Sequence, residues 1–265
     1  MSTSPHAPRD DTELGIANRR FYDSLWADAR LIGPQRFNTW PLATELAAGG
    51  TTRLEVAPGL RPRMPLDGTV FVDISMQAAR CLHAHDATAS VGLITALPFA
   101  DGVFDCVCAF DIVEHVDDDD AALAELARVS APGAALLLSV PLHEAAWTAF
   151  DEAVGHRRRY ERADLDAKLA RHGFVVERSA VHGMQPSSSR LVDLGMWFLT
   201  HQRERAMWWY NRVFMPLGLR AQKPLALQDG WIDDTRIDTV LLICRRVDPP
   251  ATAPPDTSRT IEDVA

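Results

Sequence analysis

Two acidic residues stand where short apolar segments of the chain end. Glu55 lies in Leu54-Glu55-Val56-Ala57-Pro58-Gly59, and Asp73 ends the later segment Val70–Asp73. The small residues after Glu55 would form a tight turn that lets backbone N–H groups approach a ligand. An acid at the end of the next strand can hold both hydroxyls of a ribose. The pair indicates an adenosine-containing cofactor without specifying which one, and ordinary packing at the strand ends is the alternative.

The loop after Glu55 argues against a dinucleotide. It reads Ala57-Pro58-Gly59-Leu60-Arg61-Pro62 and lacks the G-x-G-x-x-G pattern. A pyrophosphate needs the N–H groups of a helix directly after this loop, whereas Pro62 and Pro65 remove donors and oppose a helix there. No Tyr is followed by Lys four positions later, so a short-chain dehydrogenase is disfavoured. S-adenosylmethionine is the competing interpretation.

Three histidines are candidates for catalysis. His156 lies in Gly155-His156-Arg157-Arg158-Arg159-Tyr160, His143 follows a predicted strand, and His115 follows Glu114. A histidine near the reacting group can act as a general base for a hydroxyl acceptor, because its pKa lies near the operating pH. Arg159, with Tyr160 beside it, could contact an anionic acceptor. The structural alternatives are a solvated first helical turn around His156, with Tyr160 packed beneath, and a packing role for His115 at the sheet edge.

The sequence suggests no metal site. Cys106 and Cys108 alternate along a predicted strand and therefore share one face, which is typical of small core residues. Cys81 and Cys244 offer no ligand spacing. The acidic run 117–120 is explained by a helix start, where the helix dipole favours negative charge.

Apolar strand patterns alternate with helical patterns along the chain, which predicts a doubly wound α/β sheet. The expected strands lie at 53–57, 70–73, 90–94, 103–110, 134–140, 174–181 and 239–245. The expected helices lie at 14–31, 40–48, 75–83, 117–129 and 164–172. Ser75 is a plausible N-cap for the third of these helices.

Four segments together resemble class I S-adenosylmethionine-dependent methyltransferases. They are Leu54–Gly59, Val72-Asp73-Ile74-Ser75, Ala96-Leu97-Pro98-Phe99-Ala100-Asp101-Gly102-Val103-Phe104-Asp105 and Phe110-Asp111-Ile112-Val113-Glu114-His115-Val116. The chain is most similar to the small-molecule, methyltransferase type 11-like enzymes, which include ubiquinone-pathway enzymes. The match extends over about residues 50–182. It implies a Rossmann-like, seven-stranded, mostly parallel sheet whose antiparallel last strand lies between the fifth and sixth.

The resemblance also implies cofactor contacts, which carry over residue by residue. Glu55, Ala57 and Gly59 would line the methionine part of S-adenosyl-L-methionine, Asp73 would take the ribose hydroxyls, and Ile74 would pack on the adenine. Phe110 and Asp111 would lie near the transferable methyl group and the amino end. The family usually has Gly-Asp-Ala where this chain has Gly92-Leu93-Ile94. Leu93 cannot bond the adenine amine, although the backbone of Ile94 could. Ala57 also replaces the usual first glycine.

Length and charge bound the remaining possibilities. The 265 residues carry a net charge of −9, which disfavours nucleic acid as a partner. No apolar run suits a membrane span, and the polar start at 1–11 shows no signal peptide, so a cytoplasmic location is expected. We expect disordered tails at 1–11 and 249–265, and one methyltransferase domain at 12–248.

Within that domain, residues 183–236 are expected to form a helical insertion between the sixth and seventh strands. Its aromatic residues and arginines favour a lid that covers a small-molecule acceptor. That acceptor is expected to be bulky or apolar, with oxygen as the favoured methylated atom. A homodimer interface and a membrane contact through 191–217 are alternatives, the latter not favoured. The alternative function is a non-catalytic binding protein that kept the fold, motivated by Ala57 and Leu93.

Overall fold

The computed structural model describes residues 30–48, 52–183, 201–202, 205, 208–235 and 237–247. The predicted tails at 1–11 and 249–265 lie outside these residues. So do most of the predicted helix at 14–31 and residues 184–200 of the predicted insertion.

The described residues form one mixed sheet in the order β3-β2-β1-β4-β5-β8-β6-β7. Strands β1 to β5 pair in parallel, whereas β8 is antiparallel to both of its neighbours, β5 and β6. This topology confirms the predicted Rossmann-like fold with its inserted antiparallel strand. The strands are β1 (Arg53–Val56), β2 (Thr69–Asp73), β3 (Thr88–Val91), β4 (Phe104–Phe110), β5 (Ser130–Pro141), β6 (Phe174–His182), β7 (Gln228–Asp229) and β8 (Thr239–Arg246).

The sheet has one strand more than the seven predicted. Strand β7 pairs with β6 in antiparallel fashion through only two residues, Gln228 and Asp229. Both of these residues are exposed. Two polar residues show no alternation of apolar and polar positions, so this strand carries no sequence signal.

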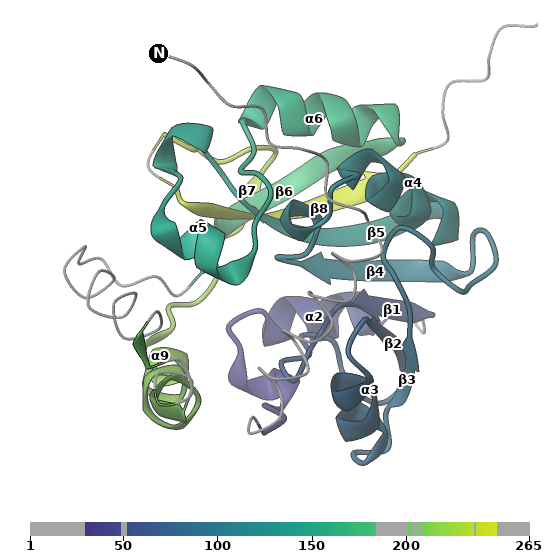
Figure 1. The fold of residues 1–265 in the computed structure, drawn as a ribbon. Helices are drawn as coiled ribbons and strands as arrows, with labels where there is room; N and C mark the ends of the chain where they lie inside the picture. Colours follow the sequence, from purple (N-terminus) through teal and green to yellow (C-terminus); the bar gives the residue numbers. More distant parts are fainter. Residues whose placement is uncertain are drawn as a thin grey trace, which may run out of the picture.

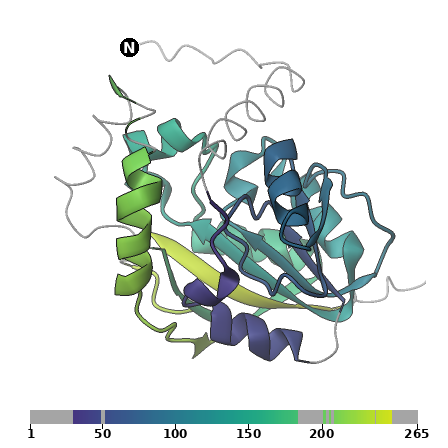
Figure 2. The same cartoon turned by 90° about the horizontal axis from the view of Figure 1, so that it is seen from below.

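Helices cover both faces of the sheet, as Figures 1 and 2 show. Helices α4 (Asp119–Val129) and α6 (Arg162–Arg171) pack on the face that includes Leu54, Leu136 and Leu138. Helices α2 (Trp40–Ala47) and α3 (Met76–His83) cover the other face. Cys106 and Cys108 are buried beneath α2, as the alternation predicted.

Caps fix where two of these helices begin. The Ser75 hydroxyl accepts the N–H of Ala78, which confirms the predicted N-cap of α3. Helix α4 begins at Asp119 rather than at residue 117, because the Asp118 side chain accepts the N–H of Ala121 and ends the preceding extended backbone. The acids Asp119 and Asp120 then occupy the first turn.

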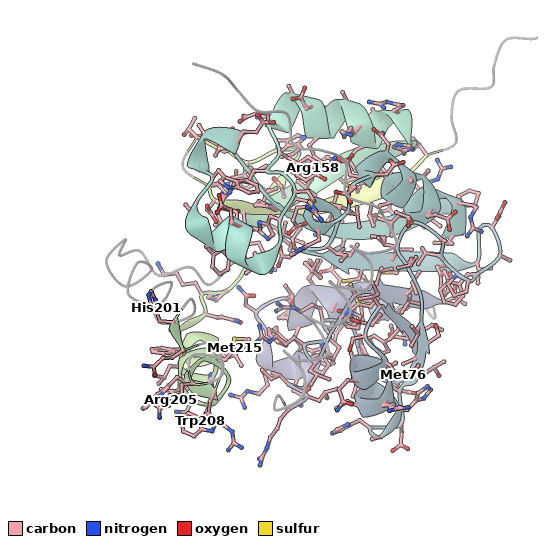
Figure 3. All side chains as sticks on the ribbon, in the orientation of Figure 1. Met76, Arg158, His201, Arg205, Trp208 and Met215 are labelled. Atoms are coloured by element: carbon pink, nitrogen blue, oxygen red, sulfur yellow. The ribbon has the colours of Figure 1, made fainter. Side chains whose placement is uncertain are left out.

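The described part of the insertion packs beside residues 32–37. A π-helical turn, η4 (Tyr210–Phe214), leads into α9 (Met215–Ala221). Met215 and Leu219 are buried against Phe37, next to the 3₁₀ turn η1 (Pro34–Arg36). Trp208 is half exposed, and Figure 3 places it on the outer side of this helical segment. Among the described residues, no helix combines the length and apolar character that a membrane crossing requires.

Candidate active site

Three carboxylates come to one edge of the sheet because they end neighbouring parallel strands. Strand β1 lies between β2 and β4. Glu55 lies near the end of β1, Asp73 ends β2, and Asp111 directly follows β4. The carboxyl edge of an open α/β sheet is where such folds bind ligands.

Asp73 joins the loop after β1 to the start of α3. Its side chain is 5% exposed. One carboxylate oxygen accepts the N–H of Gly59 at 2.8 Å, and the other accepts the N–H of Ser75 at 2.8 Å. An ionised carboxylate has about four acceptor sites. Asp73 thus ties the loop to the start of α3, and its contact with the ribose of S-adenosylmethionine stays a prediction.

Glu55 is turned toward its own loop. The backbone N–H groups of Arg63 and Met64 donate to its carboxylate at 2.8–3.0 Å. Burial raises the pKa of Glu55 to about 7, and these two hydrogen bonds oppose the rise. No helix forms between β1 and β2, in keeping with Pro62 and Pro65. The contact of Glu55 with the methionine part of the cofactor stays a prediction.

Two residues of this loop take the left-handed backbone conformation. Gly59 has φ 54°, which glycine adopts freely, and Ala57 has φ 55°. The N–H of Ala57 donates to the carbonyl of Val72 on β2 at 2.6 Å. The loop is thus pinned to β2 in a conformation that costs an alanine free energy.

The residues expected near the adenine follow β2 and β3. Ile74 is half-buried and Ile94 is buried. Leu93 lies in a tight turn closed by a hydrogen bond from the Ala96 N–H to the Leu93 carbonyl, and its side chain is 46% exposed. An exposed leucine there offers an apolar surface in place of a hydrogen-bonding acid.

Arg63 is a site residue that the sequence reasoning missed. Its guanidinium carbon lies 3.7 Å from the centroid of the Phe37 ring and 5.8 Å from that of Phe110. Burial lowers the pKa of Arg63, while the charges of Asp111 and Glu55 raise it. A basic residue inside a proline-rich loop was the available signal, but no sequence pattern places it against the end of β4.

Asp111 is held at the end of β4 in a strained conformation, with φ 48°. The Ser139 hydroxyl donates to its carboxylate at 2.7 Å. His182 Nε2 lies 3.9 Å from the other carboxylate oxygen, and the His182 ring stacks on Phe110. Backbone strain of this kind is concentrated at functional sites.

Beyond Asp111, Glu114, His115 and His156 form a compact group, which we name the Glu–His–His cluster. Glu114 and His115 belong to the 3₁₀ turn η2 (Val113–His115), and His156 follows α5 (Ala149–Val154). The N–H of Arg157 donates to the Glu114 carbonyl at 2.7 Å and joins the two segments. The two imidazole centroids lie 4.7 Å apart, so two predicted catalytic histidines meet here.

A buried ion-pair network supports this cluster. Asp151 accepts a 2.8 Å hydrogen bond from His156 and a bidentate pair from Arg159. Arg159 also donates to Asp238 and to the carbonyl of Leu142. Arg159 is 3% exposed, and its guanidinium is already engaged by these partners, so an acceptor contact for Arg159 stays a prediction.

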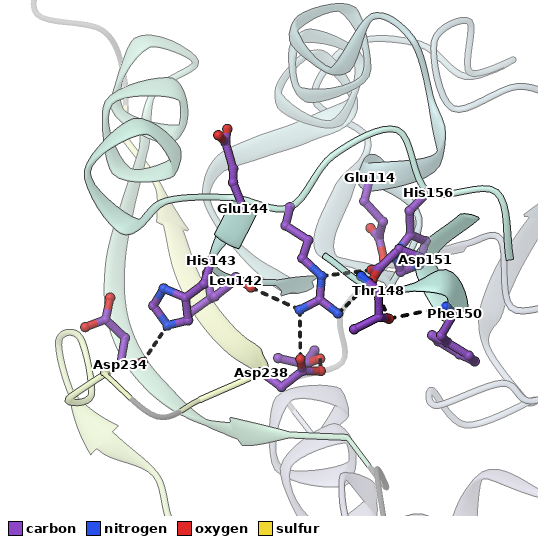
Figure 4. Close-up of polar contacts among 12 residues, drawn as sticks. Glu114, Leu142, His143, Glu144, Thr148, Phe150, Asp151, His156, Asp234 and Asp238 are labelled. Atoms are coloured by element: carbon purple, nitrogen blue, oxygen red, sulfur yellow. Dashed lines mark hydrogen bonds and ion pairs between the residues drawn. The ribbon is translucent and has the colours of Figure 1, made fainter. Parts of the chain in front are cut away.

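The other two predicted residues lie apart from the cluster. Tyr160 is buried and donates its hydroxyl to Asp119. His143 shares a 2.7 Å hydrogen bond with the carbonyl of Asp234. Figure 4 shows His143 beside Asp234 and away from Glu114, His156 and Asp151. The roles predicted for Tyr160 and His143 at the acceptor stay predictions.

The chain is similar in sequence to known methyltransferases. Residues 57–138 match the family model described as a methyltransferase domain. An uncharacterized methyltransferase of Mycobacterium sp. strain JLS is 27% identical over 210 residues, covering 73% of this chain and 81% of the relative. A demethylmenaquinone methyltransferase of Mycolicibacterium vanbaalenii is 37% identical over 145 residues, covering 54% and 59%.

Solved structures share the fold at low identity. A structure described as a putative sarcosine dimethylglycine methyltransferase from Galdieria sulphuraria has a TM-score of 0.54 at 16% identity, covering 89% of this chain and 99% of that chain. The [4+2]-cyclase SpnF has a TM-score of 0.56 at 16% identity, covering 93% and 99%. These likenesses concern the fold alone.

The fold and the family match define the class of this protein. Residues 57–138 resemble the methyltransferase type 11 domain, and the sheet has the class I fold. The protein is an S-adenosylmethionine-dependent small-molecule methyltransferase. Its methyl donor is S-adenosyl-L-methionine.

The strained loop yields a first prediction. Ala57→Gly should raise the free energy of unfolding by about 0.5–1 kcal/mol, since relief of left-handed strain exceeds the added freedom of the unfolded chain. Denaturant unfolding measures the change. Asp86→Gly is the matched control, because exposed Asp86 has φ 62° away from the site and should gain less. A less stable Ala57→Gly variant would contradict the strain.

The buried Glu55 yields a second prediction, on pH. Because its pKa is raised from 4.5 to about 7, the folded state holds this proton more tightly than the unfolded state. Its contribution to stability is fully present below about pH 4.5 and is lost as the pH rises to about 7, by up to about 3 kcal/mol.

Urea unfolding at about pH 5 and about pH 8 measures this slope. Glu55→Gln should remove it, whereas Glu152→Gln, a change at an exposed position, should retain it. An equal slope in the wild type and in Glu55→Gln would show that Glu55 ionises normally.

Proposed function

We propose that this enzyme transfers the methyl group of S-adenosyl-L-methionine to an oxygen atom of a bulky, apolar small molecule. The observation that supports oxygen as the methylated atom is the Glu–His–His cluster, which begins three residues after Asp111. A hydroxyl must lose its proton to become a strong nucleophile, and groups that bind or polarise a hydroxyl are of use there.

The cofactor would lie along the carboxyl ends of β1, β2 and β4. Asp73 would take the ribose hydroxyls, Ile74, Leu93 and Ile94 would surround the adenine, and Ala57, Gly59, Phe110 and Asp111 would face the methionine part. When bound, S-adenosylmethionine supplies an activated methyl group on a sulfonium. The protein therefore has mainly to orient the acceptor oxygen in line with that group.

The apolar character of the acceptor is supported by the described part of the insertion. Met215 and Leu219 of α9 pack on Phe37. The guanidinium of Arg63 lies over the Phe37 ring and also near the ring of Phe110. Phe214 and Leu217 are 60% and 55% exposed on the same segment. This chain of contacts brings apolar side chains toward the end of β4, as a lid would. Relatives named for demethylmenaquinone favour an acceptor of this kind.

A non-catalytic binding protein is the second candidate, favoured by one observation. Leu93 stands where the family usually has an acid that bonds the adenine amine. Tight cofactor binding without methyl transfer to any acceptor would favour this candidate.

Asp73 gives the test of the cofactor's position. Asp73→Ala should weaken binding of S-adenosylhomocysteine by about 1–3 kcal/mol, roughly ten- to a hundredfold, because a hydrogen-bonded charged group is lost. Calorimetric titration measures the affinity, and thermal unfolding checks that the variant is folded. Asp67→Ala, a change at an exposed position, is the control. Unchanged affinity in Asp73→Ala would remove Asp73 from the site.

The methylated atom is tested by product analysis. The enzyme is supplied with isotope-labelled S-adenosylmethionine, apolar phenols and quinols, and amines of matching shape. We expect labelled methyl ethers from the hydroxyl compounds, located by mass spectrometry. Label on nitrogen or carbon of the best acceptor would contradict the oxygen assignment.

A further inference from the structure

The Glu–His–His cluster has the composition of a metal centre. Glu114, His115 and His156 each offer one ligand atom, and the three atoms lie within 4.8 Å of one another. Sequence spacing gave no hint of this set, because His156 comes from a separate segment that the hydrogen bond between Arg157 and Glu114 brings into place.

The Glu114 carboxylate lacks hydrogen bonds in the part of the chain that the structure describes. Glu114 is fully buried, and among the described residues neither of its carboxylate oxygens has a hydrogen-bond partner. Within these residues, His156 pairs with it loosely: Nε2 of His156 lies 3.8 Å from Oε1 of Glu114, beyond hydrogen-bond distance. A buried carboxylate left in this way costs several kcal/mol unless it binds a cation or a proton.

Each of the two histidines forms a hydrogen bond to a group outside the cluster. His156 Nδ1 is bonded to Asp151 at 2.8 Å, which leaves Nε2 facing Glu114. His115 forms a hydrogen bond to the backbone of Gly155. Metal-ligating histidines characteristically donate their second ring N–H to a carboxylate or a backbone carbonyl, and this orients the ligating nitrogen.

The electrostatics of the cluster suit a cation. Neutral imidazoles keep a nitrogen lone pair for a metal. Asp111 and Asp151 add negative charge nearby, while Arg159 is bound to Asp151 and Asp238.

We propose that Glu114, His115 and His156 bind a divalent first-row transition-metal cation. Two histidines and one carboxylate leave coordination positions open, as in catalytic zinc and iron sites. Because the cluster begins three residues after Asp111, the inference rests on the proposed function and gives the cation a role in it: an acceptor hydroxyl at an open position would have a lowered pKa.

The balance of the assisted reaction is simple. The acceptor hydroxyl gives its proton to water, its oxygen forms a bond to the methyl carbon, and the bond between that carbon and sulfur breaks. The sulfonium becomes the neutral thioether S-adenosylhomocysteine, with one proton released and no change of oxidation state. In this account His156 is a ligand rather than a general base.

The experiment uses the full chain, freed of metal with a chelator and titrated with Zn²⁺ alone. We expect one Zn²⁺ per chain at micromolar affinity or tighter, and a rise of the melting temperature with Zn²⁺. Glu114→Gln and His156→Ala should each weaken binding by at least about tenfold. His83→Ala, at an exposed position of α3, is the control and should leave the affinity unchanged.

A second readout avoids dependence on the variants. Co²⁺ bound to the wild-type chain should give visible ligand-field absorption that Zn²⁺ displaces. Absence of both Zn²⁺ binding and the Co²⁺ spectrum, with and without S-adenosylhomocysteine, would overturn the proposal and leave a protonated Glu114. Binding unaffected by both substitutions would overturn it as well, by placing the metal elsewhere.

The same titrations separate the two hypotheses. If S-adenosylhomocysteine binds and Zn²⁺ does not, the metal site fails while the methyl-transfer function stands. If Zn²⁺ binds at the cluster and the product mixture carries label only on nitrogen or carbon, the metal site stands while the oxygen assignment fails.

Discussion

The carboxylate of Asp151 is the constraint on which the arrangement of the Glu–His–His cluster depends. It is fully buried, and it closes a capping box with Thr148 at the start of α5. Burial alone would raise the pKa of Asp151, but hydrogen bonds from Arg159, Thr148 and His156 outweigh that effect and hold its pKa below the usual range. Arg159 extends the network to Leu142 at the end of the sheet and to Asp238 before β8. The arrangement therefore fixes the segment between β5 and α6, and with it the ring of His156, against η2.

The loop between β1 and β2, which we propose as the cofactor side of the site, is held by different contacts. No helix lies between β1 and β2, so no helix N-terminus can face a ligand there. Side-chain hydrogen bonds hold the connecting loop in place instead. Glu55 and Asp73 bind backbone N–H groups of the loop from two sides, while Arg63 brings a positive charge toward Asp111. Hydrogen bonds from two sides therefore add to the restriction that the prolines place on the loop, and Ala57 carries the cost of a left-handed conformation.

Much of the fold was predictable, because the apolar patterns of β1, β4, β5 and β8 match buried strands and are flanked by recognisable turns. The inserted position of β8 came from the family resemblance. Strand β7 was not predictable, since two exposed polar residues carry no pattern. The candidate site divides in the same way. Asp73 and Asp111 follow from their places at strand ends, whereas the meeting of His115 with His156 depends on a backbone hydrogen bond that no spacing rule encodes. Arg63, His182 and the burial of Arg159 likewise depend on tertiary contacts between distant segments.

The central claim is that the carboxyl edge of this sheet binds S-adenosylmethionine. Calorimetric titration of the wild-type chain with S-adenosylmethionine, S-adenosylhomocysteine and NAD tests it most directly. The account predicts micromolar binding of both sulfur nucleosides, one per chain, and no binding of NAD. Binding of NAD, or of neither sulfur nucleoside, would contradict it.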